Sequence, residues 1–574
     1  RQGDPSSPLL YNFALEPLLA ALRATLTPVL NCVVSAYADD VAVFLDSPAE
    51  ARKLLDLLRL YERASGARLN DHKTRVLLLG SASIEQAPWR AAFPQASFCT
   101  AADPINYLGV QLGGDDPYTP PYQRASQTLE RLDAVARFSS PATRVVCANT
   151  LVTSRLLYAW SHLPLNPRKA DLHNDHVYNF VWGGKRSPLP REHVFGLRPE
   201  GKMGLLDVYD VVSAMQMRLL GRLLDAPPTP ASRLAWAALR KTITVRDNMN
   251  VPAVARLKPP WLDASDDALM SALPQASSSV RFWQIVINEV FRLGADIRRD
   301  LREDRLMLML PSKAAADWRP GMPIADANMA PLSSFSNRGL RKMLHRLRHG
   351  TPLLKPAPTP ADFHWPVLVP RVQPRPLTAA QHWRWVHAPL RRPEWRQLHF
   401  MIIHGAVAVN ARLVHSTDQG YDTCESYCGE RETAHHLFYD CPLVRPAWRF
   451  FEDYVRRAFA TRPANAPPPG RRGGVEQHIL TDLLYYCKTL PAIYAALNVG
   501  QACMLQAIWD VRNGAKFKQY PFTTELINHT FVVLVRAHLR YIARSLPSYM
   551  RETWAPPDNR GLFLADGRTF ALDA

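Results

Sequence analysis

Two short apolar runs, residues 32–38 and 41–45, flank a pair of adjacent carboxylates, Asp39 and Asp40. Both runs are rich in β-branched and aromatic residues, and two such runs separated by two turn-forming residues are typical of a tight β-hairpin. We therefore expect the carboxylates at the hairpin tip. Their adjacent charges destabilise the fold unless a cation such as Mg²⁺ neutralises them. Alternatively, Asp-Asp is simply a favourable turn pair.

The segments on either side of the hairpin carry helix signals. Ser7 and Pro8 suit the N-cap and the first position of a helix that continues to Leu19. Residues 47–50 have the form of a capping box, and the helix that they begin should end at Gly66. The sequence therefore predicts two helices that bracket the hairpin.

Four segments then occur in a distinctive order. They are Gln2-Gly3, the hairpin, residues 66–74 and residues 106–110. In order and spacing they resemble motifs B, C, D and E of a reverse transcriptase palm, with the closest resemblance to the non-LTR (LINE-type) retrotransposon enzymes. Tyr-Ala-Asp-Asp alone would be weak evidence, but the four motifs together are specific. The resemblance covers about the first 110 residues strongly and much of the remainder less sharply.

The resemblance implies a role for each matching residue. Asp39 and Asp40 would be catalytic ligands of Mg²⁺, with Asp39 the main one, because two cations neutralise the charge that develops in phosphoryl transfer. The other implied roles are proton donation to pyrophosphate by Lys73, nucleotide and template contacts at Gln2 and Gly3, and a primer grip at Tyr107, Leu108 and Gly109, on a strand of the same sheet. The alternatives are a surface lysine at position 73 and a core aromatic at position 107.

The function implied is that of an RNA-directed DNA polymerase, which uses Mg²⁺ and deoxynucleotides to extend a DNA primer on an RNA template. Polymerases of this family take a third essential aspartate from an earlier strand, and we expect this chain to begin after that strand. We therefore expect the C-terminal part of a longer protein, inactive as a polymerase by itself. The alternative is a non-catalytic nucleic-acid-binding remnant of a retroelement.

A cluster of metal-ligand residues lies further along the chain. Cys424, Cys428, His436 and Cys441 have the spacing Cys-x3-Cys-x7-His-x4-Cys. Three thiolates and one imidazole suit tetrahedral Zn²⁺ in a closed structural site, which leaves no position for a catalytic water. The run is similar to the zinc-binding domain that follows the polymerase in LINE-type proteins, and this similarity selects His436 over His435. The alternative is a coincidental group of buried cysteines.

The charge and hydropathy of the chain restrict the classes of binding partner that we expect. Its 69 Lys and Arg residues exceed its 51 Asp and Glu residues, and the formal charge of +18 favours RNA or DNA as a partner. No apolar run reaches the roughly 18 to 20 residues that span a bilayer, so we expect no membrane association. We expect an intracellular protein, nuclear when it acts on chromosomal DNA. The oligomeric state is left open.

The length of 574 residues requires several domains. We expect an α+β chain: a partial palm (1–115), a thumb-like helical region (116–240), a helical connector with a basic helix at 337–349 (241–350), a Pro-rich linker (351–376), a zinc-binding domain (377–462), a Pro/Gly/Arg linker (463–474) and a C-terminal helical region (475–574). The basic helix would either lie along nucleic acid or be solvated. Residues 508–517 resemble a Trp-x-x-Arg-Asn helix near the end of many LINE-type proteins.

Overall fold

The computed structural model describes most of the chain. The described residues are 6–26, 34–38, 40–45, 47–70, 73–78, 86–100, 103–112, 116–136, 140–225, 229–247, 278–300, 305–311, 329–349, 379–388, 390–414, 421–451 and 491–545. The chain divides into two compact units, which are treated separately below. The first unit comprises residues 1–128, 151–173 and 208–348, and the second comprises 129–150, 174–207 and 349–574.

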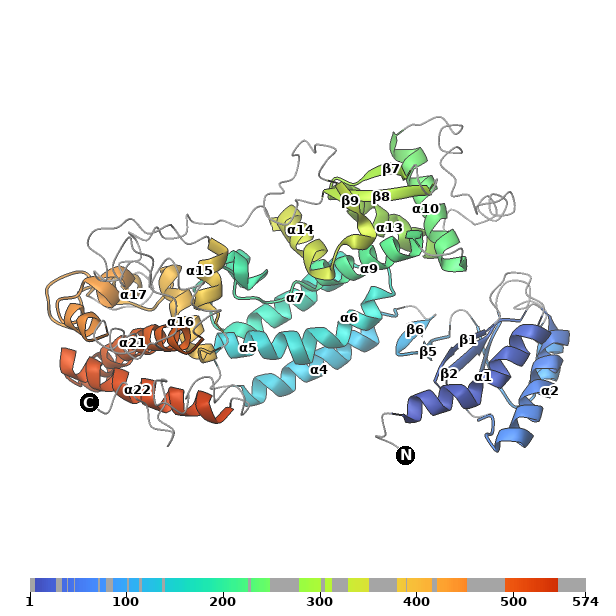
Figure 1. Cartoon of the computed structure of the whole chain (residues 1–574), viewed down its shortest axis with the longest axis horizontal. Helices are drawn as coiled ribbons and strands as arrows, with labels where there is room; N and C mark the ends of the chain where they lie inside the picture. The colour runs from blue at the N-terminus through green and yellow to red at the C-terminus, as the bar shows by residue number, and fades with distance from the viewer. Residues whose placement is uncertain are drawn as a thin grey trace, which may run out of the picture. The chain divides into compact units, whose positions relative to one another are not determined.

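The first unit begins with two helices and a hairpin (Figure 1). These elements are α1 (Ser7–Thr25), β1 (Val34–Tyr37), β2 (Asp40–Val43) and α2 (Pro48–Ser65), and the strands pair antiparallel. Leucines of α1, among them the fully buried Leu22, form a core with Leu54 of α2 and with Leu26, the fully buried residue that follows α1. Val34 and Val43 of the hairpin pack against that core. The predicted helix–hairpin–helix segment is therefore present.

The ends of α2 follow the local sequence signals. The Ser47 side chain is the N-cap and accepts a hydrogen bond from the Glu50 backbone N–H at 3.4 Å. Gly66 ends the helix with φ of +73°, a left-handed conformation that strains any residue with a Cβ atom. The N-cap at Ser47 and the glycine stop are both confirmed.

The remaining strands of the palm-like segment are short. Among the described residues they form two further two-stranded sheets, β3 (Arg75–Leu77) parallel to β4 (Ser97–Cys99), and β5 (Ile105–Tyr107) antiparallel to β6 (Val110–Leu112), with α3 (Gln86–Ala92) between β3 and β4. We expected Tyr107 to share a sheet with the two carboxylates. In the described part of the chain, β5 and β6 instead form a sheet separate from β1 and β2.

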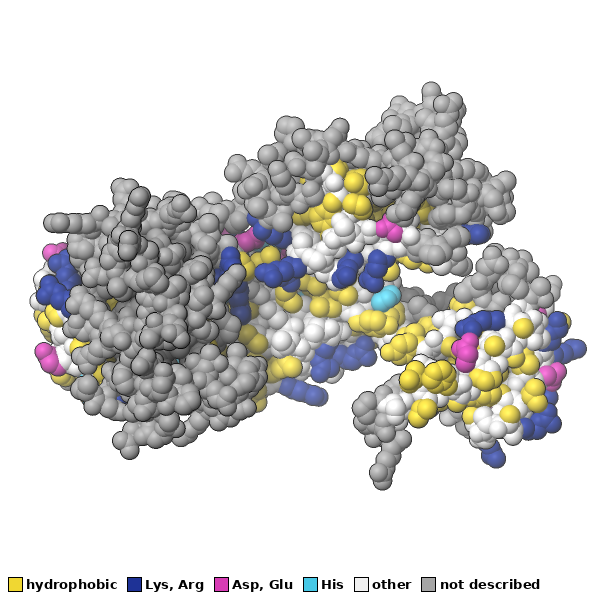
Figure 2. Space-filling model, viewed as in Figure 1, with side chains coloured by type: hydrophobic (Ala, Val, Ile, Leu, Met, Phe, Trp, Pro, Cys, Tyr) yellow, Lys and Arg dark blue, Asp and Glu magenta, His cyan; other side chains and the backbone are white. Residues whose placement is uncertain are grey.

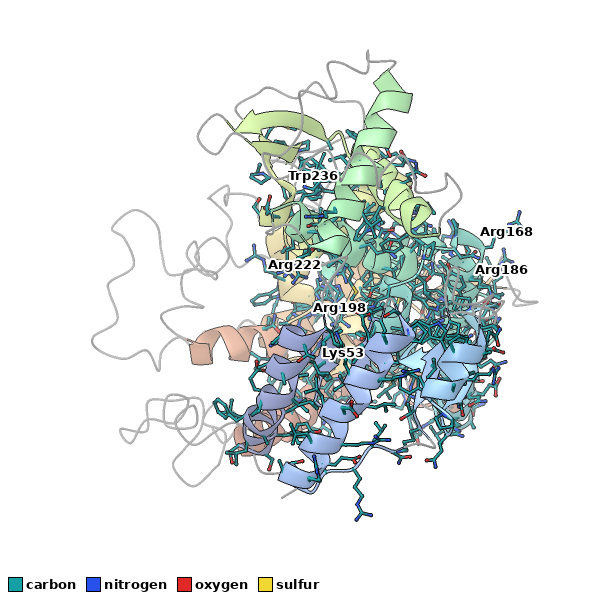
Figure 3. All side chains as sticks on the ribbon, turned by 90° about the vertical axis from the view of Figure 1, so that its right-hand side faces the viewer. Lys53, Arg168, Arg186, Arg198, Arg222 and Trp236 are labelled. Carbon is teal, nitrogen blue, oxygen red and sulfur yellow. The ribbon has the colours of Figure 1, made fainter. Side chains whose placement is uncertain are left out.

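A second core completes the first unit. It gathers α9 (Val208–Asp225), α10 (Pro230–Asp247), α13 (Ser278–Arg292) and α14 (Asn337–His349) around buried side chains such as Trp236 (Figure 3). A three-stranded antiparallel sheet also contributes, formed by β7 (Asp296–Asp300), β8 (Arg305–Pro311) and β9 (Met329–Pro331). The sequence did not predict this sheet, because β8 pairs with strands separated from it by irregular sequence.

Residues 141–161, within the helical region expected over 116–240, form an irregular helical stretch. It consists of α5 (Pro141–Cys147), a π-helical segment (Ala148–Thr153) and α6 (Ser154–Ser161). Three further helical elements precede α9, namely α4 (Thr119–Val135), α7 (Pro167–Trp182) and α8 (Arg191–Val194), together with the short turn η3 (Arg198–Glu200). The mainly helical character expected after the palm-like segment is present, and no helix in the described ranges is long and apolar enough to cross a membrane.

The rest of the second unit is helical. Its elements include α15 (Ala379–Val386), α16 (Pro393–Ile403), α17 (Asn410–Leu413), the π-turn η7 (His436–Asp440), α21 (Pro491–Lys518) and α22 (Thr524–Ser545). The long helix α21 packs against α22, α16 and η7. It therefore supports the segment that carries the predicted zinc ligands.

Replacement of Gly66 by Ala should lower the free energy of unfolding of the N-terminal segment by about 1 kcal/mol, because an L-residue is strained at this φ. A Cβ at this position would meet no atom within 4 Å, so the effect reports backbone conformation alone. Hydrogen exchange of the α2 amides in urea measures the change. Gly339→Ala, inside α14, is the matched control and should stabilise that helix instead.

Candidate functional site

The β1–β2 hairpin presents Asp40 at the start of a strand. Tyr37 pairs with Asp40, so Asp40 belongs to β2. We had expected it in the turn at the hairpin tip. Ala38 enters the turn with φ of +51°, which explains the shift because the left-handed turn position precedes the two acids. Asp40 is exposed, and no side chain in the described ranges pairs with its carboxylate. Asp39 lies outside the described residues, as do Gln2 and Gly3.

Lys73 lies in an exposed turn between α2 and β3. Its backbone N–H donates to the Asn70 carbonyl at 3.0 Å and to the Asn70 side chain at 3.2 Å. The structure shows no contact between its ammonium group and Asp40 among the described residues. Its expected role at a triphosphate is therefore still a prediction.

The three residues expected at the primer grip form a turn. Leu108 and Gly109 connect β5 to β6 with φ of +48° and +78°, whereas we had expected a continuous strand. Two successive positive φ values are typical of a type I′ hairpin turn, which favours glycine at one of the two positions. Tyr107 is half-buried, and its hydroxyl donates to the Ser35 hydroxyl of β1 at 3.5 Å. This contact joins the two hairpins at the face of β1.

The four predicted zinc ligands converge in the second unit. The ligand atoms of Cys424, Cys428, His436 and Cys441 all lie within 4.8 Å of one another. The Cys428 sulfur lies 3.2 Å from Nε2 of His436. His435 is directed elsewhere, since its ring Nδ1 lies 2.7 Å from a carboxylate oxygen of Asp440. The geometry therefore groups His436 with the cysteines and leaves His435 outside the cluster.

The backbone between the first two cysteines is sharply turned. Tyr427, between the two cysteines, has φ of +58° and a side chain that is 94% exposed, and Gly429, directly after Cys428, has φ of +83°. This turn accommodates the three intervening residues of Cys-x3-Cys and brings both sulfurs to one centre. A bulky residue in the left-handed region is uncommon and marks a functional constraint.

The chemistry of the sulfurs suits a cation. Contact with the Cys424 thiol, together with the Ser426 hydroxyl 3.2 Å from the Cys441 sulfur, lowers the pKa of Cys441 to about 5. The same contact, together with burial, raises the pKa of Cys424. The thiolate is the form that binds a metal, so a sulfur that already favours the thiolate is a suitable ligand.

A buried ion pair joins this cluster to α21. The Arg512 guanidinium lies 2.6 Å from the Glu432 carboxylate, and the two side chains are 1% and 0% exposed. Glu432 also accepts hydrogen bonds from the backbone N–H groups of Asn410 at 2.8 Å and of Glu425 at 3.3 Å. The carboxylate is therefore fully hydrogen-bonded. Glu432 holds both the loop before Cys428 and the turn before His436.

Two further contacts extend this connection. Trp509 stacks on Phe438 with ring centroids 6.1 Å apart, and Lys516 pairs with Glu425 at 3.2 Å. The Trp-x-x-Arg-Asn helix, for which the sequence identified no chemistry, thus braces the cysteine cluster. The sequence analysis did not identify Glu432 as a residue that supports the cluster. Its position four residues before His436 is the sequence feature that points to it.

The basic helix α14 is partly committed to internal contacts. Arg348 pairs with Asp210 of α9 at 3.0 Å and with Asp171 at 3.7 Å, and Nδ1 of His345 lies 2.9 Å from Asp210. Arg346 is itself buried. The expectation that the cations of this helix all occupy a solvent-facing side is therefore wrong, because α9 supplies acidic partners for one end.

We expect Arg512→Leu to lower the free energy of unfolding by about 3 to 5 kcal/mol, because it leaves the Glu432 carboxylate buried without a counter-charge. Urea unfolding followed by tryptophan fluorescence measures the loss. Adding Glu432→Leu should restore part of it, since the uncompensated charge is then removed.

Arg445→Leu removes an exposed arginine that lies 3.8 Å from Asp440, and it should change stability by less than about 1 kcal/mol. If Arg512→Leu costs no more than this control, the buried pair does not support the cluster.

Comparison with known proteins identifies the N-terminal segment. Residues 1–112 match the family described as reverse transcriptase (RNA-dependent DNA polymerase). The chain is 30% identical over 247 residues to the transposon TX1 uncharacterized 149 kDa protein of Xenopus laevis, which covers 40% of this chain and 18% of that protein. It is also 30% identical over 93 residues to the retrovirus-related Pol polyprotein from type-1 retrotransposable element R2 of Popillia japonica, which covers 15% of each chain.

The chain thus spans less than a fifth of the length of these curated relatives. The family match coincides with the helix–hairpin–helix segment that carries Asp40 and with the β5–β6 hairpin. Residues 1–112 are therefore a reverse transcriptase segment, and the chain is similar in part to two proteins of retroelements.

Proposed function

We propose that this chain contributes the catalytic palm of an RNA-directed DNA polymerase, which extends a DNA primer on an RNA template from deoxynucleotides. The observation that carries the proposal is the exposed Asp40 on the β1–β2 hairpin, inside the segment that matches the reverse transcriptase family. An acid that no side chain in the described ranges neutralises is available to a cation.

Each residue of the palm has a distinct task in this proposal. Asp39 and Asp40 would hold Mg²⁺, which when bound neutralises charge on the transferring phosphate. Lys73 would donate a proton to the departing pyrophosphate, and Gln2 and Gly3 would contact nucleotide and template. The turn of Tyr107, Leu108 and Gly109 would position the primer end, and the bond from Tyr107 to Ser35 ties it to the catalytic hairpin.

Asp39→Asn should reduce RNA-templated primer extension by roughly 100-fold or more, the loss expected for one transition-state electrostatic contact. The measurement uses the longest open reading frame that contains this chain, with a labelled primer. Asp56→Asn is the control, because Asp56 is an exposed acid on α2 that pairs only weakly with Arg59 at 3.7 Å. Asp56→Asn should leave extension unchanged, and extension that survives Asp39→Asn at the level of this control would exclude the assignment.

We further propose that Cys424, Cys428, His436 and Cys441 bind one structural Zn²⁺. The donor set fits the ion, since three sulfurs and one ring nitrogen within 4.8 Å of one another match a closed tetrahedral shell. Such a site contributes folding energy and performs no catalysis. Its position beside α21 suggests a platform for the nucleic acid, and action on chromosomal DNA would place the protein in the nucleus.

His436→Ala should release the metal and lower the melting temperature of the second unit, whereas His435→Ala should retain one metal ion per chain. The contrast arises because the His435 ring is directed to Asp440 and away from the sulfurs. Metal content by mass spectrometry and melting by circular dichroism provide the two measurements. Retention of stoichiometric zinc by His436→Ala would show that the ligand set is wrong.

A further inference from the structure

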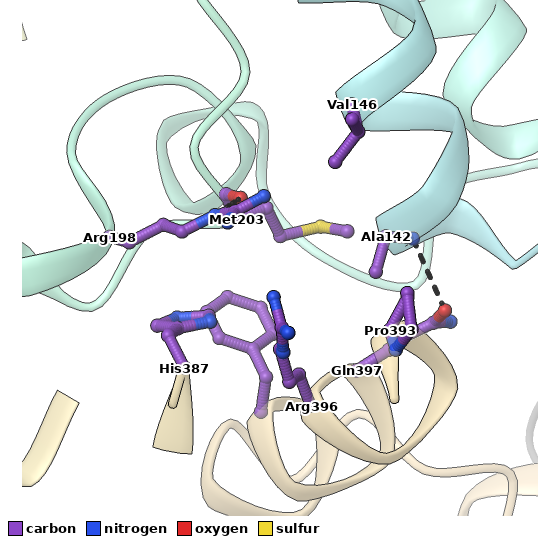
Figure 4. Close-up of a pocket in the computed structure, with 9 residues that line it drawn as sticks. Ala142, Val146, Arg198, Met203, His387, Pro393, Arg396 and Gln397 are labelled. Carbon is purple, nitrogen blue, oxygen red and sulfur yellow. Dashed lines mark hydrogen bonds between the residues drawn. The ribbon is translucent and has the colours of Figure 1, made fainter. Parts of the chain in front are cut away.

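A solvent-open pocket in the second unit brings together two arginines from distant parts of the sequence. The pocket is lined by Arg198 and Met203 of the loop after α8, by Ala142 and Val146 of α5, and by His387, Pro393, Arg396, Gln397 and Phe400 of the α15–α16 region. Figure 4 shows Arg198 and Arg396 reaching the same space from opposite walls. No carboxylate is among these lining residues.

Arg198 is held in place by the backbone of its own loop. Its Nε donates to the Met203 carbonyl at 3.2 Å. Gly204 has φ of +94°, and a Cβ there would lie 2.8 Å from this Nε, so only glycine lets the guanidinium lie so close to the chain. Asn149 fixes the same loop, since its side chain donates to the Gly204 carbonyl at 2.9 Å and accepts from the Leu206 N–H at 3.0 Å.

Arg396 is fixed in a similar way on the opposite wall. Its Nε donates to the Arg391 carbonyl at 2.9 Å. Beside it, the Gln397 side chain accepts a hydrogen bond from the Ala142 N–H at 3.3 Å, which joins α16 to α5 at the edge of the pocket (Figure 4). Both arginines are therefore positioned by the fold and are not free surface side chains.

The electrostatics of the pocket favour an anion. Burial lowers the pKa of Arg198, and burial together with the positive charge of Arg198 lowers the pKa of Arg396. The two cations thus repel each other across a partly apolar space. Glu394 acts in the opposite direction on Arg396, but its side chain is exposed and does not line the pocket. Among the described residues, Arg198 has no acidic partner at all.

We propose that Arg198 and Arg396 form a binding site for one phosphate group of a nucleic-acid backbone. The guanidinium fork matches phosphate oxygens in a bidentate manner, and a shared anion would relieve the repulsion between the two cations. We identify the phosphate as part of a nucleic acid because of the proposed function. The site itself rests only on the pocket geometry.

The test measures oligonucleotide binding and phosphate binding by the full chain. We expect Arg198→Gln and Arg396→Gln each to weaken binding of a single-stranded RNA or a DNA duplex by about 3- to 10-fold at low salt. Each change should also reduce the slope of log affinity against log salt by about one, because one phosphate contact is lost. Fluorescence anisotropy over a series of salt concentrations provides both values.

Arg449→Gln is the matched control. Arg449 is an exposed arginine of the same unit that does not line the pocket, so its removal changes the net charge equally. If the two pocket variants behave like Arg449→Gln, the proposal is overturned. If the glutamine variants do not fold, Val146→Phe keeps both arginines and narrows the pocket at a residue that is 42% exposed, and it too should weaken binding.

A test with inorganic phosphate distinguishes free phosphate from the phosphate of a nucleic-acid backbone as the ligand. We expect inorganic phosphate to raise the melting temperature of the unchanged chain above that in chloride at equal ionic strength, and not to raise that of Arg198→Gln. A phosphate effect with unchanged oligonucleotide binding would assign the pocket to a free phosphate and overturn the nucleic-acid proposal. These binding and melting measurements do not depend on primer extension. The polymerase assignment, tested with Asp39→Asn, can therefore fail while the phosphate site stands, and the reverse is also possible.

Discussion

The ion pair between Arg512 and Glu432 is the contact on which the second unit depends. Burying both charges is costly unless each is paired and hydrogen-bonded, and here two backbone N–H groups and the Asn410 side chain complete the arrangement. Because Glu432 lies between Cys428 and His436, the pair fixes the spacing of the sulfurs and of the ring before any metal binds. The long helix α21 thereby becomes part of the cysteine cluster.

The net charge of the chain is larger than the number of cationic side chains available to a nucleic acid would suggest. Arg144, Arg391 and Arg512 are buried and donate to carbonyls, amides or carboxylates of the chain itself. Among the described residues in Figure 2, Lys and Arg side chains lie next to apolar and uncharged ones. A formal charge of +18 therefore indicates a class of partner, while the location of the contact must come from geometry.

The parts of the fold that could be predicted are those encoded by neighbouring residues. Ser47 and Gly66 set the ends of α2, and the apolar runs around Asp40 set a hairpin, since each signal acts within a few positions. The position of Asp40 in the strand was missed because a single left-handed residue, Ala38, moves the turn. The β7–β9 sheet, the pairing of Arg512 with Glu432 and the pocket between Arg198 and Arg396 join residues far apart in sequence, and no local pattern records such pairings.

Four charged residues of this structure illustrate two different electrostatic situations, a matched buried pair and unmatched single charges. Glu432 and Arg512 are buried and matched, so their charges stabilise one arrangement of the chain and have little left to offer a ligand. Asp40 and Arg198 are positioned by backbone geometry, yet neither has a partner of opposite charge among the described residues. Arg198 is partly buried, so its unmatched charge costs free energy that a bound anion would remove. The exposed Asp40 carboxylate is solvated by water and is accessible to a cation. In our proposals a cation would bind at the β1–β2 hairpin and an anion between α5 and α16, and these are the two kinds of charge that a polymerase on a polyphosphate substrate must bind.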